Sequence, residues 1–171
     1  YEMFEKMNIR TDQVLEAAST KWNFMHFRPG LVGGHCIGVD PYYLIHQSLA
    51  LGYSPKIISS ARELNESMAS SVVQKFMAEL QVRKTDFSSL VVVVFGFSFK
   101  EECSDFRNSK VIDVLRLLDS LDIAYRVYDN HVDVDSVRNE TGIEINKDVD
   151  DNFDVGLLFV PHQKLTLFCE N

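Results

Sequence analysis

The sequence predicts an α + α/β protein, with an all-helical part first and a three-layer α/β domain after it. Three observations support this prediction. Apolar residues recur at helical spacing through most of the first half, a run of β-branched residues follows, and helix-like and strand-like segments then alternate. We place the boundary at residue 86, which gives domains over residues 1–86 and 87–171.

The helical part begins with a segment over residues 3–18. Four of its apolar residues lie near one helical stripe: Phe4, Met7, Val14 and Leu15. Thr11 and Asp12 are placed to cap a second short helix within this segment, because both side chains can accept hydrogen bonds from free backbone amides.

A loop rich in Pro and Gly follows over residues 27–35. Asp40 before Pro41 then predicts a helix start, since Asp caps the free amides and Pro is favoured at the first helical position. We expect this helix to reach residues 47–51.

From Pro55 to about Arg83, apolar residues repeat at helical spacing without an internal Pro or Gly. This pattern predicts one long helix, with a possible break at residues 65–67. Its apolar stripe is larger than so small a domain can cover, so we expect the helical part to be a dimerisation domain that forms a homodimer.

The second part opens on a β-branched run over residues 90–96, which is typical of a strand buried on both faces of a parallel sheet. Alternating units follow it: a helix over residues 109–122, a strand over 124–129, a weak helical signal over 132–141 and a strand over 155–161. This order is the doubly wound α/β pattern.

Composition and charge exclude several classes of protein. The 17 Lys and Arg residues against 25 Asp and Glu give a net charge of −8, which has the wrong sign for non-specific nucleic-acid binding. The longest apolar run, residues 90–97, is far shorter than the ~20 residues of a membrane span. Residues 1–6 lack the pattern of a secretion signal, so we expect a cytoplasmic protein with no membrane partner.

The chain has three cysteines, Cys36, Cys103 and Cys169. Their odd number and their spacing predict neither a disulfide framework nor a zinc site, and we assign no metal. Acidic neighbours disfavour the thiolate of Cys103, and Cys169 lies near the end of the chain, so neither is a candidate nucleophile. His162 follows the last strand, and a structural role is favoured over ligand contact.

Cys36 has the surroundings of a nucleophile. Gly33 and Gly34 before it allow a substrate to approach the backbone closely, and the positive end of the following helix favours a thiolate. Asp40, four residues on, can orient the thiol or relay a proton. The alternatives are a small buried hydrophobic residue and a metal site with His35, which lacks a fourth ligand of suitable spacing.

Two segments resemble the UDP-glucose/GDP-mannose dehydrogenase family. Residues 27–44 (FRPGLVGGHCIGVDPYYL) resemble its cysteine loop, and residues 95–109 (FGFSFKEECSDFRNS) resemble the strand, lysine loop and Asp-x-Arg turn that open its Rossmann-like nucleotide-sugar domain. The similarity is greatest to bacterial UDP-N-acetylhexosamine 6-dehydrogenases of capsule and O-antigen synthesis. It extends over essentially the whole chain and weakens after about Val132.

The resemblance implies a four-electron oxidation, in which two NAD molecules in turn accept hydride from C6 of a UDP-sugar to give a uronate. Cys36 would be the nucleophile, forming a thiohemiacetal and then a thioester, and Asp40 would assist the proton and water steps. Lys100 matches a lysine that contacts the nucleotide sugar. Lys21 or Arg28 matches a basic residue that reaches the substrate of the partner subunit.

Arg107 matches a position near the cofactor phosphates, with a salt bridge to Asp105 or Glu102 as the structural alternative. The Gly-x-Gly-x-x-Gly fingerprint of dinucleotide binding is absent, and Gly96 after the valine run is a single glycine. We therefore expect that NAD is bound mainly by an N-terminal domain absent from this chain, and that the chain alone is inactive.

Two other functions stay open. One is a non-catalytic module for nucleotide binding and dimerisation, which would not need the pair of Cys36 and Asp40. The other is a cysteine hydrolase, for which no recognisable arrangement of His with Asn or Asp is present.

Overall fold

The computed structural model describes residues 1–83, 90–150 and 152–169, and these residues form two compact units, one over residues 1–30 and one made of the described residues from Leu31 onward. The predicted domain boundary at residue 86 lies outside the described residues and stays a prediction. None of the described helices combines the length and the apolar character that a membrane span requires.

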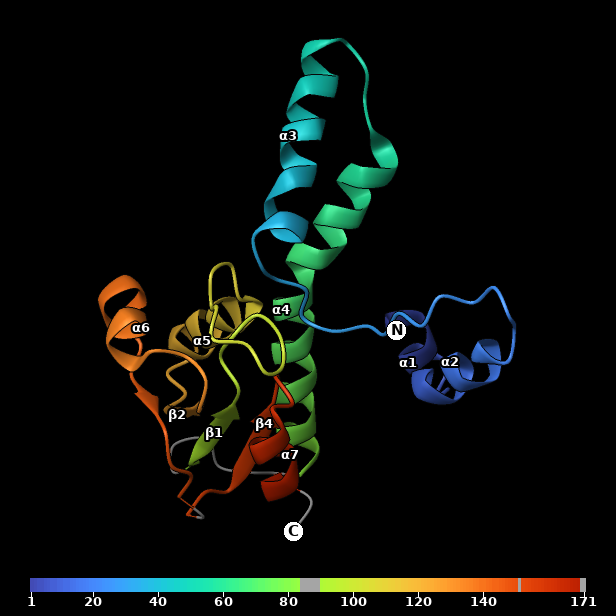
Figure 1. Ribbon diagram of the computed structural model, residues 1–171. Coiled ribbons are helices and arrows are strands. Elements are labelled where there is room, and N and C mark those ends of the chain that lie inside the picture. Colours follow the sequence, from blue (N-terminus) through green and yellow to red (C-terminus); the bar gives the residue numbers. More distant parts are fainter. Residues whose placement is uncertain (84–89, 151, 170–171) are drawn as a thin grey trace. The chain divides into compact units, whose positions relative to one another are not determined.

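The first unit contains α1 (Glu2–Lys6) and α2 (Thr11–Ser19) (Figure 1). The predicted cap of the second helix is wrong. Arg10 occupies the N-cap position of α2 without a side-chain cap, and Thr11 is the first helical residue. Asp12 forms an ion pair with Arg10, the residue at the N-cap position.

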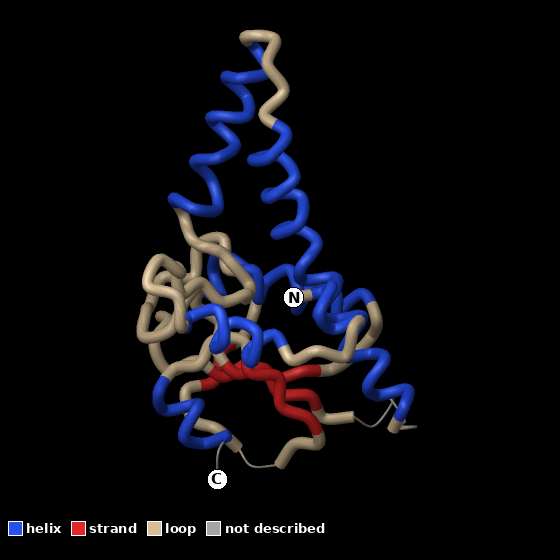
Figure 2. Tube along the Cα trace, turned by 90° about the vertical axis from the view of Figure 1, so that its right-hand side faces the viewer, coloured by secondary structure: helices blue, strands red, loops and turns tan. Residues whose placement is uncertain are grey.

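The second unit begins with a helical hairpin formed by α3 (Cys36–Ala50) and α4 (Lys56–Val82). α3 and the first half of α4 run side by side in opposite directions and extend away from the sheet (Figures 1 and 2). The predicted helix start at Asp40 and Pro41 is wrong, because α3 begins at Cys36 and Pro41 lies inside it. The long helix is confirmed, and it continues unbroken through residues 65–67.

The rest of the second unit is an α/β structure built on a parallel sheet with the strand order β3-β2-β1-β4. Its elements in chain order are β1 (Val92–Phe95), α5 (Lys110–Ser120), β2 (Tyr125–Tyr128), α6 (Val134–Thr141), β3 (Ile145–Asn146), β4 (Val155–Leu158) and α7 (Gln163–Cys169). The predicted alternation of strands and helices is confirmed. The short β3 and the helix α7 were not predicted.

Apolar side chains cover both faces of β1. Val92 and Val94 join a core with the second half of α4 and with α5, while Val93 and Phe95 pack on the other face with Leu165 of α7. All four strand residues are buried, which confirms the prediction for this run. The second half of α4 is thus part of the α/β core.

Candidate active site

Cys36 is the first residue of α3, and its thiol is free and exposed. Backbone amides that lack intrahelical acceptors give this end of a helix a partial positive charge, which favours an anion such as a thiolate. Asp40 is also exposed, and it lies four residues on along α3, so both side chains project from the same side of the helix. This end of α3 therefore presents a thiol and a carboxylate one turn apart.

Both glycines before Cys36 are fixed by contacts within the chain. A Cβ atom at Gly33 would lie 2.4 Å from the carbonyl oxygen of Asn108, and one at Gly34 would lie 2.9 Å from the ring of Phe99. Gly34 also has a φ of +89°, a conformation that other residues rarely adopt. The protein's own backbone and ring approach these glycines closely. Contact of either glycine with a substrate stays a prediction.

The same contacts bring the cysteine loop to the lysine loop, residues 97–109. Phe99 packs on Gly34, and the Nζ atom of Lys100 lies 5.4 Å from the centre of the Phe99 ring. At the other end of the loop, Asn108 donates a hydrogen bond of 3.5 Å from its amide to the carbonyl oxygen of Gly34. Gly34 and Asn108, 74 residues apart in sequence, therefore bring the two motifs together in one surface.

Asp129, directly after β2, holds the start of the lysine loop. Its fully buried carboxylate accepts hydrogen bonds from the amides of Phe97 (2.7 Å) and Ser98 (3.1 Å) through Oδ2, and from those of His131 and Val132 through Oδ1. Burial alone would raise the pKa of Asp129, but these backbone hydrogen bonds together with His162 lower it. The carboxylate is thus held as an anion.

His162 is fully buried beside Asp129. Its Nδ1 accepts a hydrogen bond of 3.0 Å from the amide of Glu102, so the ring proton is on Nε2, which lies 3.0 Å from Oδ2 of Asp129 and 3.2 Å from Oγ of Ser98. The Ser and the Asp share one ring nitrogen, which is not the arrangement of a hydrolytic triad. His162 therefore has the structural role that was favoured from the sequence.

Glu102, His131 and His162 bring potential metal-ligating atoms within 4.8 Å of one another. Both nitrogens of His162 are already used in hydrogen bonds, and Glu102 accepts a bond of 2.8 Å from the first amide of α7, at Gln163. The His131 ring stacks on His162 with the ring centres 4.4 Å apart. This group connects the lysine loop to α7 through hydrogen bonds and ring stacking without needing an ion.

Arg107 forms a two-pronged ion pair with Asp105, at 3.0 Å from Nε to Oδ1 and 2.6 Å from Nη2 to Oδ2. The guanidinium lowers the pKa of Asp105 to about 2. One of the salt bridges left open by the sequence is therefore present. Contact of Arg107 with cofactor phosphates stays a prediction.

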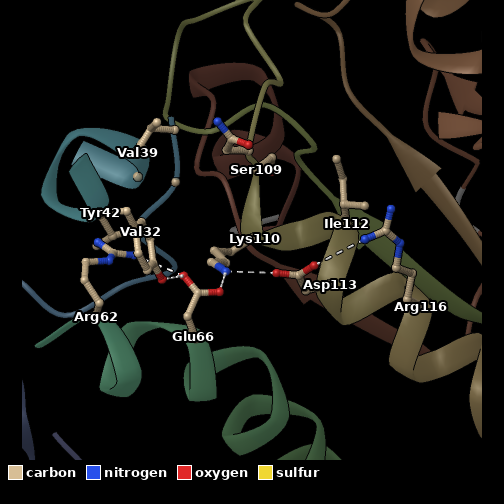
Figure 3. Close-up of a pocket in the computed structure, with 13 residues that line it drawn as sticks. Val32, Val39, Tyr42, Arg62, Glu66, Ser109, Lys110, Ile112, Asp113 and Arg116 are labelled. Carbon is tan, nitrogen blue, oxygen red and sulfur yellow. Dashed lines mark hydrogen bonds and ion pairs between the residues drawn. The ribbon is translucent and has the colours of Figure 1, made fainter. Parts of the chain in front are cut away.

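A pocket of about 480 Å³ lies where the start of α3, the middle of α4 and the start of α5 meet (Figure 3). A chain of charges crosses it, from Arg62 through Glu66 and Lys110 to Asp113 and Arg116. Lys110 donates to Glu66 and lowers the pKa of that carboxyl group. These residues were not predicted from the sequence, although Pro41 inside a helix is a signal, because its missing amide leaves a backbone carbonyl in need of another donor.

Lys21 and Arg28 belong to the first unit. Lys21 lies just beyond the end of α2, and its backbone amide donates a hydrogen bond to the carbonyl oxygen of Ala18. Arg28 lines a hollow of about 280 Å³ with residues of α2, among them Asp12 and Glu16. Their part in a substrate site stays a prediction.

Comparison with known proteins places both parts of the chain in one family. The family models that match are the UDP-glucose/GDP-mannose dehydrogenase family central domain, over residues 1–67, and the UDP binding domain of the same family, over residues 93–168.

Among curated proteins, a UDP-N-acetyl-D-glucosamine 6-dehydrogenase of Salmonella typhi is 42% identical over 163 residues, which are 95% of this chain and 38% of that protein. The protein of the same name from Pseudomonas aeruginosa is 47% identical over 141 residues, 82% of this chain and 33% of the relative. Among solved structures, the UDP-N-acetyl-mannosamine dehydrogenase Cap5O from S. aureus is similar with a TM-score of 0.73 and 28% identity, over 95% of this chain and 37% of that chain. The chain thus spans between 33% and 38% of the length of these relatives.

Proposed function

Since this chain belongs to the UDP-glucose/GDP-mannose dehydrogenase family, we propose that it carries the nucleophile and the UDP-binding domain of an NAD-dependent UDP-sugar 6-dehydrogenase. The substrate is a UDP-N-acetylhexosamine, and the product is the uronate used in surface polysaccharide synthesis. The observation that carries the proposal is the exposed Cys36 at the first position of α3, with Asp40 one turn further on and the lysine loop packed against the cysteine loop.

In the proposed reaction, the C6 alcohol of the sugar first loses a hydride and a proton to give an aldehyde, and the thiolate of Cys36 attacks this aldehyde to form a thiohemiacetal. Loss of a second hydride from C6 and of the hydroxyl proton converts the thiohemiacetal to a thioester. Asp40 takes a proton from the water that attacks the thioester, which gives the carboxylate and releases the sulfur of Cys36. NAD, when bound, supplies the hydride acceptor. Lys100 contacts the nucleotide sugar from the lysine loop.

The turn after β1 does not fit a dinucleotide. A Cβ atom at Gly96 would lie 2.4 Å from Cβ of Val160, so the space beside this glycine is filled by the chain itself and not open to a pyrophosphate. Arg107 pairs with Asp105, and its side chain is still 63% exposed. We therefore propose that NAD is held mainly by a domain outside this chain, with Arg107 near its phosphates.

The homodimer belongs to the same proposal, because the hairpin exposes large apolar side chains. Ile57 is 86% exposed and Leu51 76%, and further exposed residues of the hairpin are Tyr43, Leu44, Leu49, Tyr53 and Leu64. A protein gains by burying such a surface against a second copy. This surface also suits a non-catalytic dimerisation module, but such a module has no need of Cys36 with Asp40.

The first test uses the chain itself. Cys36 is alkylated with iodoacetamide, and the modified peptides are quantified by mass spectrometry with and without UDP-N-acetylglucosamine. We expect the sugar nucleotide to slow alkylation of Cys36 and not that of Cys169. Equal rates for Cys36 with and without the sugar nucleotide would count against a substrate site here.

The second test measures the chemistry. This chain replaces the matching 163 residues of the Salmonella relative, and uronate formation is followed by mass spectrometry. Cys36→Ser should abolish uronate, since a serine hydroxyl lacks the nucleophilicity of a thiolate, and Asp40→Asn should slow it by roughly 10²–10⁴-fold. Cys169→Ser is the matched control and should keep the parent rate. Uronate formed at the parent rate by Cys36→Ser would overturn the proposal.

A further inference from the structure

Pro41 leaves a gap in the hydrogen bonds of the helix that carries Cys36. In an α-helix the carbonyl of residue i accepts from the amide of residue i+4. Pro41 is the sixth residue of α3 and has no amide hydrogen, so the carbonyl of Ile37 lacks its intrahelical donor. Ile37 directly follows Cys36, so the unfilled bond lies in the first turn of the helix.

Arg62 of α4 fills this gap. Its Nη1 donates to the carbonyl oxygen of Ile37 at 3.1 Å, and its Nη2 donates to Oε1 of Glu66 at 3.2 Å. The guanidinium carbon lies 5.6 Å from the centre of the Tyr42 ring, and the Arg62 side chain is only 9% exposed. A buried cation is thus directed at the one carbonyl that Pro41 deprives of a donor.

The same network reaches the α/β core. Glu66 accepts from Arg62, from the hydroxyl of Tyr42 at 3.3 Å and from Lys110 of α5, and Lys110 also pairs with Asp113 at 3.0 Å (Figure 3). Lys110 is the first residue of α5, three residues after Arg107 of the Asp-x-Arg turn. The first turn of α3 is therefore connected to both α4 and α5 by way of Arg62.

We infer that Arg62 is a positioning residue for Cys36: it replaces the backbone donor missing at Pro41 and holds the first turn of α3 in place. A helix end stabilises a thiolate only while its first turn is formed, because the free amides must stay aligned. The link to catalysis rests on the proposed function, whereas the hydrogen-bond replacement does not.

A double-mutant cycle tests this inference on the whole chain. The variants are Arg62→Met, Pro41→Ala and the two combined, because alanine at residue 41 restores the amide that can donate to Ile37. The readouts are hydrogen exchange of the peptide that covers residues 36–44 and the rate of Cys36 alkylation by iodoacetamide at pH 7. Cys169 on the same chain is the internal reference.

We expect Arg62→Met to speed exchange of this peptide at least tenfold and to slow Cys36 alkylation at least threefold. With Pro41→Ala already present, the same substitution should change either rate by less than twofold. Arg62→Lys keeps a single donating nitrogen, so its exchange and alkylation rates should lie between those of Arg62→Met and the parent. Glu66→Gln keeps the bond from Arg62 to Ile37 and should alter both rates less than Arg62→Met does.

Equal effects of Arg62→Met with and without Pro41→Ala would overturn the inference, since a role in packing or in ion pairing alone does not depend on the amide at residue 41. If Arg62→Met does not fold, the inference requires that adding Pro41→Ala restores folding, and failure to restore it also overturns the inference. These readouts need no substrate. Failure of the proposed function would be seen in a different experiment, as uronate formation by Cys36→Ser. The results of the double-mutant cycle would then still be those expected here.

Discussion

The same apolar periodicity runs through both halves of α4, but its residues are buried in the second half and exposed in the first. In the second half, Ala69, Val73 and Leu80 are at most 5% exposed and pack into the α/β core. In the first half, Ile57 is 86% exposed and Leu64 is 55% exposed. The periodicity is the same in both halves, so it indicates that a helix has an apolar face without indicating what covers that face.

Titratable groups show the same contrast. Asp129 and His162 are fully buried and form hydrogen bonds with each other and with amides of the lysine loop. Asp40 and His46, in contrast, lie exposed on α3. Buried polar groups of this kind contribute to stability through hydrogen bonds, and exposed ones are available to ligands. Matched substitutions in the two regions separate these roles.

The largest effect is expected for apolar residues of α4. Leu80→Ala should lower the free energy of unfolding by about 2–5 kcal/mol, because it removes buried methyl groups and leaves a cavity. Leu64→Ala on the exposed half should change it by about 0.5 kcal/mol or less at low protein concentration. Urea unfolding followed by circular dichroism measures both. Similar losses for the two variants would mean that the exposed half is covered in the monomer.

The next effect is expected at the buried histidine. His162→Ala removes the acceptor of the Glu102 amide and the donor to Asp129, so it should cost about 1–3 kcal/mol and speed hydrogen exchange in the lysine loop. His46→Ala is the exposed counterpart and should stay within about 0.5 kcal/mol of the parent. An unchanged lysine loop in His162→Ala would show that Asp129 alone holds it.

A pH dependence follows from Asp129. Its pKa is lowered in the folded chain, so the carboxylate contributes stability above its unfolded pKa of about 3.9, and this contribution is lost as the pH falls through the lower folded value. Asp129→Asn should be less stable than the parent at pH 7 and should lose less stability between pH 5 and 2. Urea unfolding across this range provides the measurement. Parallel pH curves for parent and variant would contradict the assigned role.

Ile57→Glu is expected to have the smallest effect on the stability of the single chain. Its effect on self-association should be clear. A charge at this exposed apolar position should leave the monomer's stability within about 0.5 kcal/mol of the parent. It should weaken self-association at least tenfold, about 1.4 kcal/mol. Sedimentation equilibrium at micromolar concentrations measures this, with Asn139→Glu on α6 as the control. A parent chain that stays monomeric would refute the proposed homodimer.

Much of the fold could be predicted from local patterns. The run that forms β1, the long α4 and the alternation after residue 90 each follow from a periodicity within one segment. The short β3 was missed because two residues cannot show a period, and α7 was missed because its seven residues make fewer than two helical turns, too few to show one. Cys36 and Asp40 were singled out from their spacing, while Arg62, Asn108 and Asp129 were not, because nothing near them in sequence shows which groups they contact.

The sequence by itself determined that glycines precede Cys36, that a helix follows them and that a buried parallel strand comes later. Only the tertiary structure decided where that helix starts. Local preference puts Pro41 at the first turn, but the helix begins five residues earlier, because Arg62, 25 residues away, donates to the carbonyl that Pro41 leaves without a donor. Asp129 and His162, 33 residues apart, likewise hold the lysine loop through hydrogen bonds that form only when the strands lie side by side.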